Sequence, residues 1–265
     1  MFLVAFGHES DSVAINKSSA FGKALWYFVS LMNGNSSQPK RLDRILANAG
    51  YCSRKEAGKF IRSGRVAING ETTRDQAAHA VMSQVTIDGE PLNQPETILV
   101  MLNKPIGYVC SHDSGEGPRI YDFLPDQWML RNPVPTSIGR LDKDTSGLIL
   151  ITDNTMLVHQ YTSPKNHVEK CYEVEVDHEI SATLVGLFAS GTLILAGETT
   201  PSLPAQLSIT GERTCTITVT EGKYHLVRKM FGYAGYDVTM LHRVRFGPYQ
   251  LGSLASGCIQ EVSVQ

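Results

Sequence analysis

Strand-like segments between residue 97 and the end of the chain restrict the fold more than any other feature. Two of them alternate polar and apolar residues, as a strand with one buried face does, and two are short apolar runs. These segments are Tyr172–Val176, Thr214–Thr220, Ile98–Leu102 and Ile149–Thr152. Helices are expected at 180–190 and 224–234, and they interrupt the strands without a regular β-α-β period. The pattern predicts an α+β fold with a mixed, mainly antiparallel sheet over 97–265.

Residues 39–96 have a different pattern, that of a compact α/β module. Apolar residues recur at helical spacing from Leu42 to Ala49, and Gly50 follows as a stop signal. Ser53 and Glu56 form a capping-box pattern, which predicts the start of a second helix. Two short strands are expected after it, each followed by a tight two-residue turn. They are Val66–Ile68 with Asn69-Gly70, and Val85–Ile87 with Asp88-Gly89.

Basic residues cluster in this module, although the whole chain has a net charge of −2. Between Arg41 and Arg65 there are seven Lys or Arg and two acidic residues, a net charge of +5. The seven are Arg41, Arg44, Arg54, Lys55, Lys59, Arg62 and Arg65. A solvated helical face is the alternative explanation, but the one-sided charge favours contact with a polyanion.

Residues 1–38 differ in composition from both parts. They run into Asn-Gly-Asn-Ser-Ser-Gln-Pro, which is typical of a linker. One hypothesis is that Met32 is the true start of the protein and that the upstream residues are mis-assigned. We therefore expect an N-terminal extension at 1–38, disordered or mis-assigned, then the module at 39–96 and a larger domain at 97–265. A polar, Pro-containing hinge at Asn93–Glu96 would join the last two.

Several classes of protein are disfavoured. The five cysteines are odd in number and form no CxxC pair, so reduced thiols are expected rather than disulfides or a zinc site. No apolar run reaches transmembrane length and no convincing signal peptide is present, so we expect a cytoplasmic protein that contacts no membrane. A Walker loop and a Rossmann fingerprint are absent, and the eight His have no metal-ligand spacing. No metal and no small-molecule cofactor is expected.

The segment from Gly139 to Thr152 places one carboxylate, Asp142, in a polar loop that leads directly into an apolar strand. Catalytic groups often lie on loops that leave a rigid sheet. Arg140 and Lys143 on either side would favour the ionised carboxylate that a nucleophile or a base requires. An ordinary surface turn uses the same residue types, so composition and spacing leave both interpretations open.

The same segment, GRLDKDTSGLILIT, resembles the signature loop of the bacterial ribosomal-RNA pseudouridine synthases. Other segments resemble further motifs of that family, in the same order. They are Met101–Ser111, Thr162–Lys165, Glu169–Tyr172, Glu221–Phe231 and Leu241–Arg243. The module at 39–96 resembles the S4 RNA-binding domain, and the motif details are similar to the RsuA-type family, which acts on 16S rRNA. Leu226 departs from the pattern, because the family usually has Gln there, and local RNA contacts are expected to differ.

The resemblance implies that the chain isomerises a uridine of 16S rRNA to pseudouridine, with a specificity of the uridine-516 type and without a cofactor. It implies that Asp142 is the catalytic carboxylate and that Arg228 is its basic partner. It also implies that Tyr172 stacks on the target base and that Arg140 contacts phosphate or helps to extrude the base. Lys104 and Pro105 are expected to be structural.

The expected partner is ribosomal RNA or a small-subunit assembly intermediate, bound through the seven basic residues by a monomeric protein. Two alternatives are kept. One is a pseudouridine synthase acting on 23S rRNA. The other is a non-catalytic S4-type RNA-binding or ribosome-assembly factor.

Overall fold

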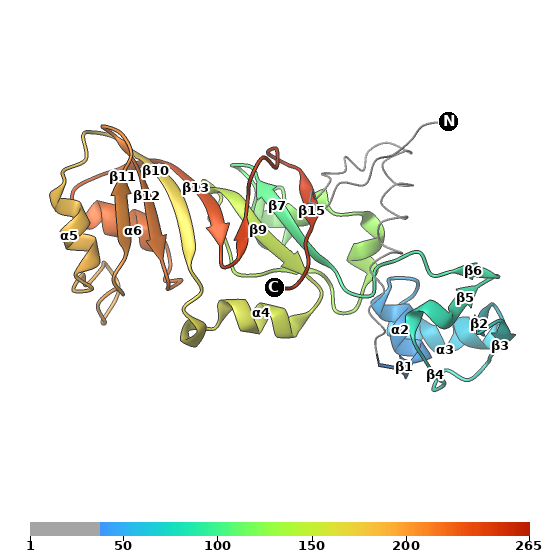
Figure 1. Cartoon of the computed structure of the whole chain (residues 1–265). Coiled ribbons are helices and arrows are strands. Elements are labelled where there is room, and N and C mark those ends of the chain that lie inside the picture. Colours follow the sequence, from blue (N-terminus) through green and yellow to red (C-terminus); the bar gives the residue numbers. More distant parts are fainter. Residues whose placement is uncertain (1–37) are drawn as a thin grey trace, which may run out of the picture.

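The computed structural model describes residues 38–265, in which a small N-terminal module lies at one end of an elongated molecule (Figure 1). Apart from Gln38, the predicted extension at 1–38 lies outside the described residues. In the module, helices α2 (Leu42–Asn48) and α3 (Arg54–Arg62) lie beside a small sheet of strand order β3-β2-β5-β6. Its strands are β2 (Val66–Ile68), β3 (Glu71–Thr72), β5 (Val85–Ile87) and β6 (Glu90–Pro91), while β1 (Lys40–Arg41) pairs with β4 (His79–Ala80).

Local sequence signals determine this module. The capping box at Ser53 and Glu56 is confirmed: the Glu56 amide donates to Ser53 Oγ at 3.3 Å, and the Ser53 amide donates to Glu56 Oε2 at 3.1 Å. The predicted strands at β2 and β5 are also confirmed. Both predicted turns have positive φ at their two central residues, as tight hairpin turns require: Asn69 51°, Gly70 85°, Asp88 52° and Gly89 87°.

The larger region is organised by one mixed sheet, with main strand order β11-β12-β10-β13-β9-β7-β15. The pair β13–β9 is parallel and the other pairs of this sheet are antiparallel, so the predicted α+β fold with a mainly antiparallel sheet is confirmed. In chain order the strands are β7 (Leu99–Lys104), β8 (Thr136–Ser137), β9 (Ser146–Thr152), β10 (Lys170–Val176), β11 (Gln206–Ile209), β12 (Thr214–Val219), β13 (Val238–Phe246), β14 (Tyr249–Gln250) and β15 (Ile259–Glu261). The helices are α4 (Thr155–Thr162), α5 (Thr183–Ala189) and α6 (Leu226–Tyr233).

Two hydrophobic clusters lie on opposite faces of this sheet. Ile149 and Ile151 of β9 belong to the larger cluster, whereas Leu148 and Leu150 belong to a second one. Both faces of β9 are therefore covered, and for this reason its sequence is a continuous apolar run. In β10, by contrast, Tyr172, Val174 and Val176 are buried and Glu173 is exposed, which explains the alternation in the sequence.

The parallel pair joins two parts of the sheet at a close approach. His242 lies opposite Ser146 and Arg243 opposite Gly147. Gly147 has φ of 103°, and a Cβ atom there would lie 2.3 Å from the carbonyl oxygen of Arg243. Only glycine fits both the dihedral angle and the space at this position. We call this contact the β9–β13 seam.

The segment 93–96, predicted to be a hinge, is fastened by a buried side chain. Arg131 is 1% exposed and donates to the carbonyl oxygens of Pro95 at 2.8 Å and Glu96 at 2.9 Å. Its guanidinium also forms an ion pair with Asp153 at 2.7 Å. The amide of the next residue, Asn132, donates to the carbonyl oxygen of Ala47 in α2 at 3.1 Å. These bonds tie the module to the larger region.

Other features of the described residues complete the fold. The five cysteines are free thiols. Within residues 38–265, every helix is too short or too polar to cross a bilayer. Helix α4 and strand β13 were not among the predicted elements, whereas α5 and α6 lie inside the predicted ranges 180–190 and 224–234.

Candidate active site

Asp142 lies in the loop that precedes β9 at the β9–β13 seam. Its side chain is 33% exposed, so solvent or a ligand can reach it. The Thr145 amide donates to the Asp142 carbonyl oxygen at 3.1 Å, which closes a turn directly before the strand. We call residues 139–145 the Asp142 loop.

Lys104, the last residue of β7, fixes the main chain of this loop through hydrogen bonds. Its side chain is fully buried, and Nζ donates to the carbonyl oxygens of Thr145 at 2.6 Å, Asp142 at 3.0 Å and Pro105 at 3.1 Å. Burial lowers the pKa of this ammonium group below its ordinary value. Since Lys104 contacts main-chain atoms and not the Asp142 carboxylate, these contacts agree with the expected structural role.

The carboxylate of Asp142 is instead contacted by His225. The distance from His225 Nε2 to Asp142 Oδ1 is 3.2 Å. His225 precedes α6 and has a left-handed backbone with φ of 53°. The ring of Tyr224 stacks on the imidazole with centroids 3.8 Å apart and an interplanar angle of 20°.

Arg228 lies near the loop, but in this structure its guanidinium pairs with Asp144 and not with Asp142 as expected. The Arg228 guanidinium is 3.0 Å from Asp144 Oδ2 and also donates to the Asp144 carbonyl oxygen at 3.2 Å. A further bond to the Val238 carbonyl oxygen at 2.9 Å fixes its direction. Because His225, directly before α6, contacts Asp142, and Arg228, within α6, contacts Asp144, the two acidic residues have different partners.

Tyr172 belongs to the hydrophobic core and is 8% exposed. It lies opposite Arg243, which in turn lies opposite Gly147 across the seam. The guanidinium of Arg243 is 6.0 Å from the centroid of the Tyr172 ring, a cation–π arrangement. Arg243 is itself buried and donates to the Leu148 carbonyl oxygen at 2.7 Å. Tyr172 is thus separated from the Asp142 loop by one strand.

The other basic residues singled out in the sequence are exposed. Arg140 lies on the surface, two residues before Asp142. The seven basic residues of the N-terminal module are also exposed. They are Arg41, Arg44, Arg54, Lys55, Lys59, Arg62 and Arg65. Arg41 forms an ion pair with Asp43, and Arg65 forms one with Asp88. Within residues 38–265, no ion pair engages the remaining five, so their charge is available to an anionic ligand.

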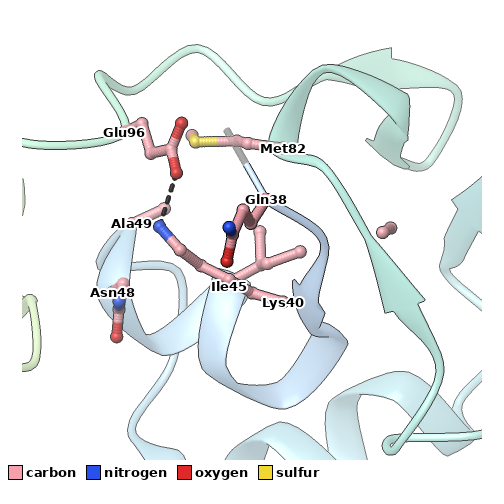
Figure 2. Close-up of a pocket in the computed structure, with 8 residues that line it drawn as sticks. Gln38, Lys40, Ile45, Asn48, Ala49, Met82 and Glu96 are labelled. Atoms are coloured by element: carbon pink, nitrogen blue, oxygen red, sulfur yellow. Dashed lines mark hydrogen bonds and ion pairs between the residues drawn. The ribbon is translucent and has the colours of Figure 1, made fainter. Parts of the chain in front are cut away.

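A pocket drawn in Figure 2 belongs to the N-terminal module and not to the Asp142 loop. Ile45, Ala49 and Met82 line it, and Lys40 forms an ion pair with Glu96 at its edge. Acidic, cysteine and histidine side chains form no group of three that could hold a metal ion in the part of the chain that the structure describes.

Residues 98–233, which include the Asp142 loop, Tyr172, His225 and Arg228, match the RNA pseudouridylate synthase family. The chain belongs to this family. Residues 40–79 match the S4 domain, which agrees with the resemblance of the basic module. The chain is thus an S4-containing RNA pseudouridine synthase.

Similar proteins span nearly the same length as this synthase. It is 39% identical to the ribosomal small subunit pseudouridine synthase A of Escherichia coli (strain K12), over 82% of this chain and 94% of that protein. It is 36% identical to an RNA pseudouridine synthase of Bacillus subtilis (strain 168) described as uncharacterized, over 84% and 95%. A solved structure titled as a pseudouridylate synthase superimposes with a TM-score of 0.59 at 36% identity, over 84% of this chain and 96% of that one.

Two residues of the synthase motifs have positions that the sequence did not indicate. Leu226 is buried in the main hydrophobic cluster at the start of α6, so its side chain packs inward. His225 was included in a motif but was assigned no role. Its contact with Asp142 depends on the left-handed backbone of His225. The identity of a residue in a motif does not indicate that its backbone has this conformation.

Proposed function

We propose that this synthase converts a uridine of 16S rRNA to pseudouridine and that Asp142 is its catalytic carboxylate. The observation that carries the proposal is the geometry of the Asp142 loop. Its main chain is fixed by buried Lys104, whereas the Asp142 carboxylate is one-third exposed at the surface. A rigid loop that presents a reachable carboxylate suits a group that must meet a sugar atom within bonding distance.

The choice of 16S rRNA rests on the names of relatives. Proteins of Escherichia coli and Pasteurella multocida that are 39% and 36% identical to this chain are named ribosomal small subunit pseudouridine synthase A. We propose the uridine-516 type of specificity on the same grounds. The substrate is then ribosomal RNA or a small-subunit assembly intermediate in the cytoplasm, bound by a monomeric enzyme.

The chemistry is an isomerisation without any redox change. The N1–C1′ bond breaks, the base turns, and C5 bonds to C1′ while the C5 proton leaves and N1 gains a proton. Asp142 either attacks C1′ or removes the C2′ proton, and both routes need the ionised carboxylate.

Other residues have supporting roles in this proposal. Tyr172 stacks its aromatic face on the uracil after the base leaves its stack in the RNA. Arg228 supplies positive charge beside the loop, and exposed Arg140 contacts an RNA phosphate or helps to extrude the base. The basic face of the S4 domain binds the RNA around the target. The domain limits are proposed as 39–96 for the S4 part and 97–265 for the catalytic part.

The test compares Asp142→Asn with the unchanged protein on 16S rRNA carrying 5-tritiated uridine. We expect no tritium release from the variant and nearly unchanged RNA binding. A pseudouridine map of rRNA from cells with and without the gene identifies the nucleotide. Loss of a modification in 23S rRNA instead would favour the alternative substrate. Full growth rescue by Asp142→Ala, with no pseudouridine made, would favour a binding role only.

A further inference from the structure

The contact between His225 and Asp142 is the starting observation. Nε2 of His225 lies 3.2 Å from Oδ1 of Asp142, and the two side chains are 36% and 33% exposed. Within residues 38–265 no other ion pair engages the Asp142 carboxylate. Oδ1 is therefore occupied by the imidazole, whereas Oδ2 is left for a substrate atom.

The backbone at His225 is unusual and directs the imidazole toward the loop. Its φ and ψ are 53° and 31°, a left-handed conformation that residues other than glycine rarely adopt. The His225 carbonyl oxygen accepts from the Lys229 amide at 2.9 Å, so this conformation is fixed by the first turn of α6. Such conformations gather at functional sites, where the surrounding structure maintains them.

An aromatic stack restricts the imidazole further. The Tyr224 ring lies 3.8 Å from it, and the Lys229 ammonium group lies 5.6 Å from the centroid of the Tyr224 ring. Tyr224 is 71% exposed, so this stack is not part of the hydrophobic core. An exposed tyrosine beside a histidine contributes little to folding, but it does limit rotation of the ring that contacts Asp142.

We propose that His225 is a positioning residue for the isomerisation. It donates the Nε2 hydrogen to Oδ1 and selects the side-chain rotamer of Asp142, so that Oδ2 faces the sugar. This inference rests on the proposed catalytic role of Asp142. It adds to that role a residue that acts through the carboxylate and does not touch the RNA.

Two substitutions separate the contact from the fold. The side-chain amide nitrogen of Gln takes the place of Nε2, whereas that of Asn takes the place of Nδ1 and is too short to reach Asp142. Asn also tolerates the left-handed backbone. We expect His225→Asn to lower kcat about 10- to 100-fold, the range for losing a hydrogen bond to a charged group, with KM within about twofold. His225→Gln should recover most of that loss.

A matched control lies at the other end of β10. His178 pairs with Asp177 at 2.9 Å and stacks on Tyr236 with centroids 4.2 Å apart, which is the same type of arrangement. His178→Asn should leave kcat unchanged. A second readout is the imidazole ¹⁵N shift of His225, which should move in Asp142→Asn because the hydrogen-bond acceptor is altered.

The outcomes are distinct for the two proposals. An active Asp142→Asn variant would contradict the proposed function itself. An inactive Asp142→Asn variant beside a fully active His225→Asn variant would overturn only the role of His225. Three other results would also overturn only the role of His225. They are equal losses of kcat in folded His225→Asn and His225→Gln variants, a comparable loss of kcat in His178→Asn, and an unchanged ¹⁵N shift of His225 in Asp142→Asn.

Discussion

The ammonium group of Lys104 donates to the carbonyl oxygen of Thr145 at 2.6 Å, and this bond fixes the end of the Asp142 loop to strand β7. The same group reaches the carbonyl oxygen of Asp142, so one buried side chain spans the turn that presents the carboxylate. The position of Asp142 is thus set through its main chain.

Replacement of Lys104 by Met should therefore reduce both turnover and stability. The variant removes a costly buried charge but leaves two or three loop carbonyl groups without a donor, each worth about 1–3 kcal/mol. We expect tritium release to fall about 10-fold or more, because a small displacement of a reacting group greatly lowers the rate of the reaction. Lys165→Met, at an exposed position, is the control. An unchanged rate of tritium release in Lys104→Met would show that the Asp142 loop keeps its conformation without the Lys104 hydrogen bonds.

The pair Arg228–Asp144 should contribute modestly to stability. Asp144 is 64% exposed and Arg228 is 21% exposed, so solvent screens the pair. A double-mutant cycle with Asp144→Asn and Arg228→Met should give a coupling free energy of about 0.5–1 kcal/mol in urea unfolding. A coupling near zero would mean that the two side chains do not interact in solution.

The basic face of the S4 domain should determine the salt dependence of RNA binding. Arg54, Lys59 and Arg62 are exposed, and we expect the triple Gln variant to weaken binding. The slope of log affinity against log salt should decrease by about 2, because each phosphate contact on single-stranded RNA contributes about 0.7. At saturating RNA, kcat should be nearly unchanged. Arg213→Gln, on the far side of the large sheet, should leave the slope unchanged.

Lys170 should give the protein a stability that increases in mildly alkaline solution. Burial, and next the charge of Arg243, lower the pKa of Lys170 from 10.5 to about 8. Between these values the unfolded chain binds more protons than the folded protein, so the free energy of unfolding rises with pH. Urea midpoints at pH 7.5 and 9.5 should show a smaller rise in Lys170→Met than in the unchanged protein. Equal rises in both proteins would contradict this origin.

The parts of the fold that follow local rules could be predicted from the sequence. The turns at Asn69-Gly70 and Asp88-Gly89 depend on two residues each, and the capping box depends on Ser53 and Glu56. Strand β10 was visible because its two faces differ. Strand β13 was not, because its pairing with β10 has irregular register at two places and because buried Arg243 interrupts the apolar pattern.

The site was only partly predictable for a related reason. The resemblance to the family implied that Arg228 pairs with Asp142, whereas in the structure Arg228 contacts Asp144 and His225 contacts Asp142. Arg228 meets Asp144, which is 84 residues away in the sequence, and the choice between Asp142 and Asp144 depends on the direction of α6. Arg131 is a similar case, since its role depends on the distant carbonyl groups of Pro95 and Glu96.

The β9–β13 seam divides the groups around the loop between two parts of the sheet. Lys104 and Asp142 come with β7 and β9, whereas Tyr172, His225 and Arg228 come with β10, α6 and the approach to β13. Neither half of the polypeptide holds a complete constellation by itself. Two separately expressed fragments, divided between β9 and β10, should each be inactive and should regain turnover only when they reassociate. The rate of tritium release would then measure the fraction of fragments that have reassociated.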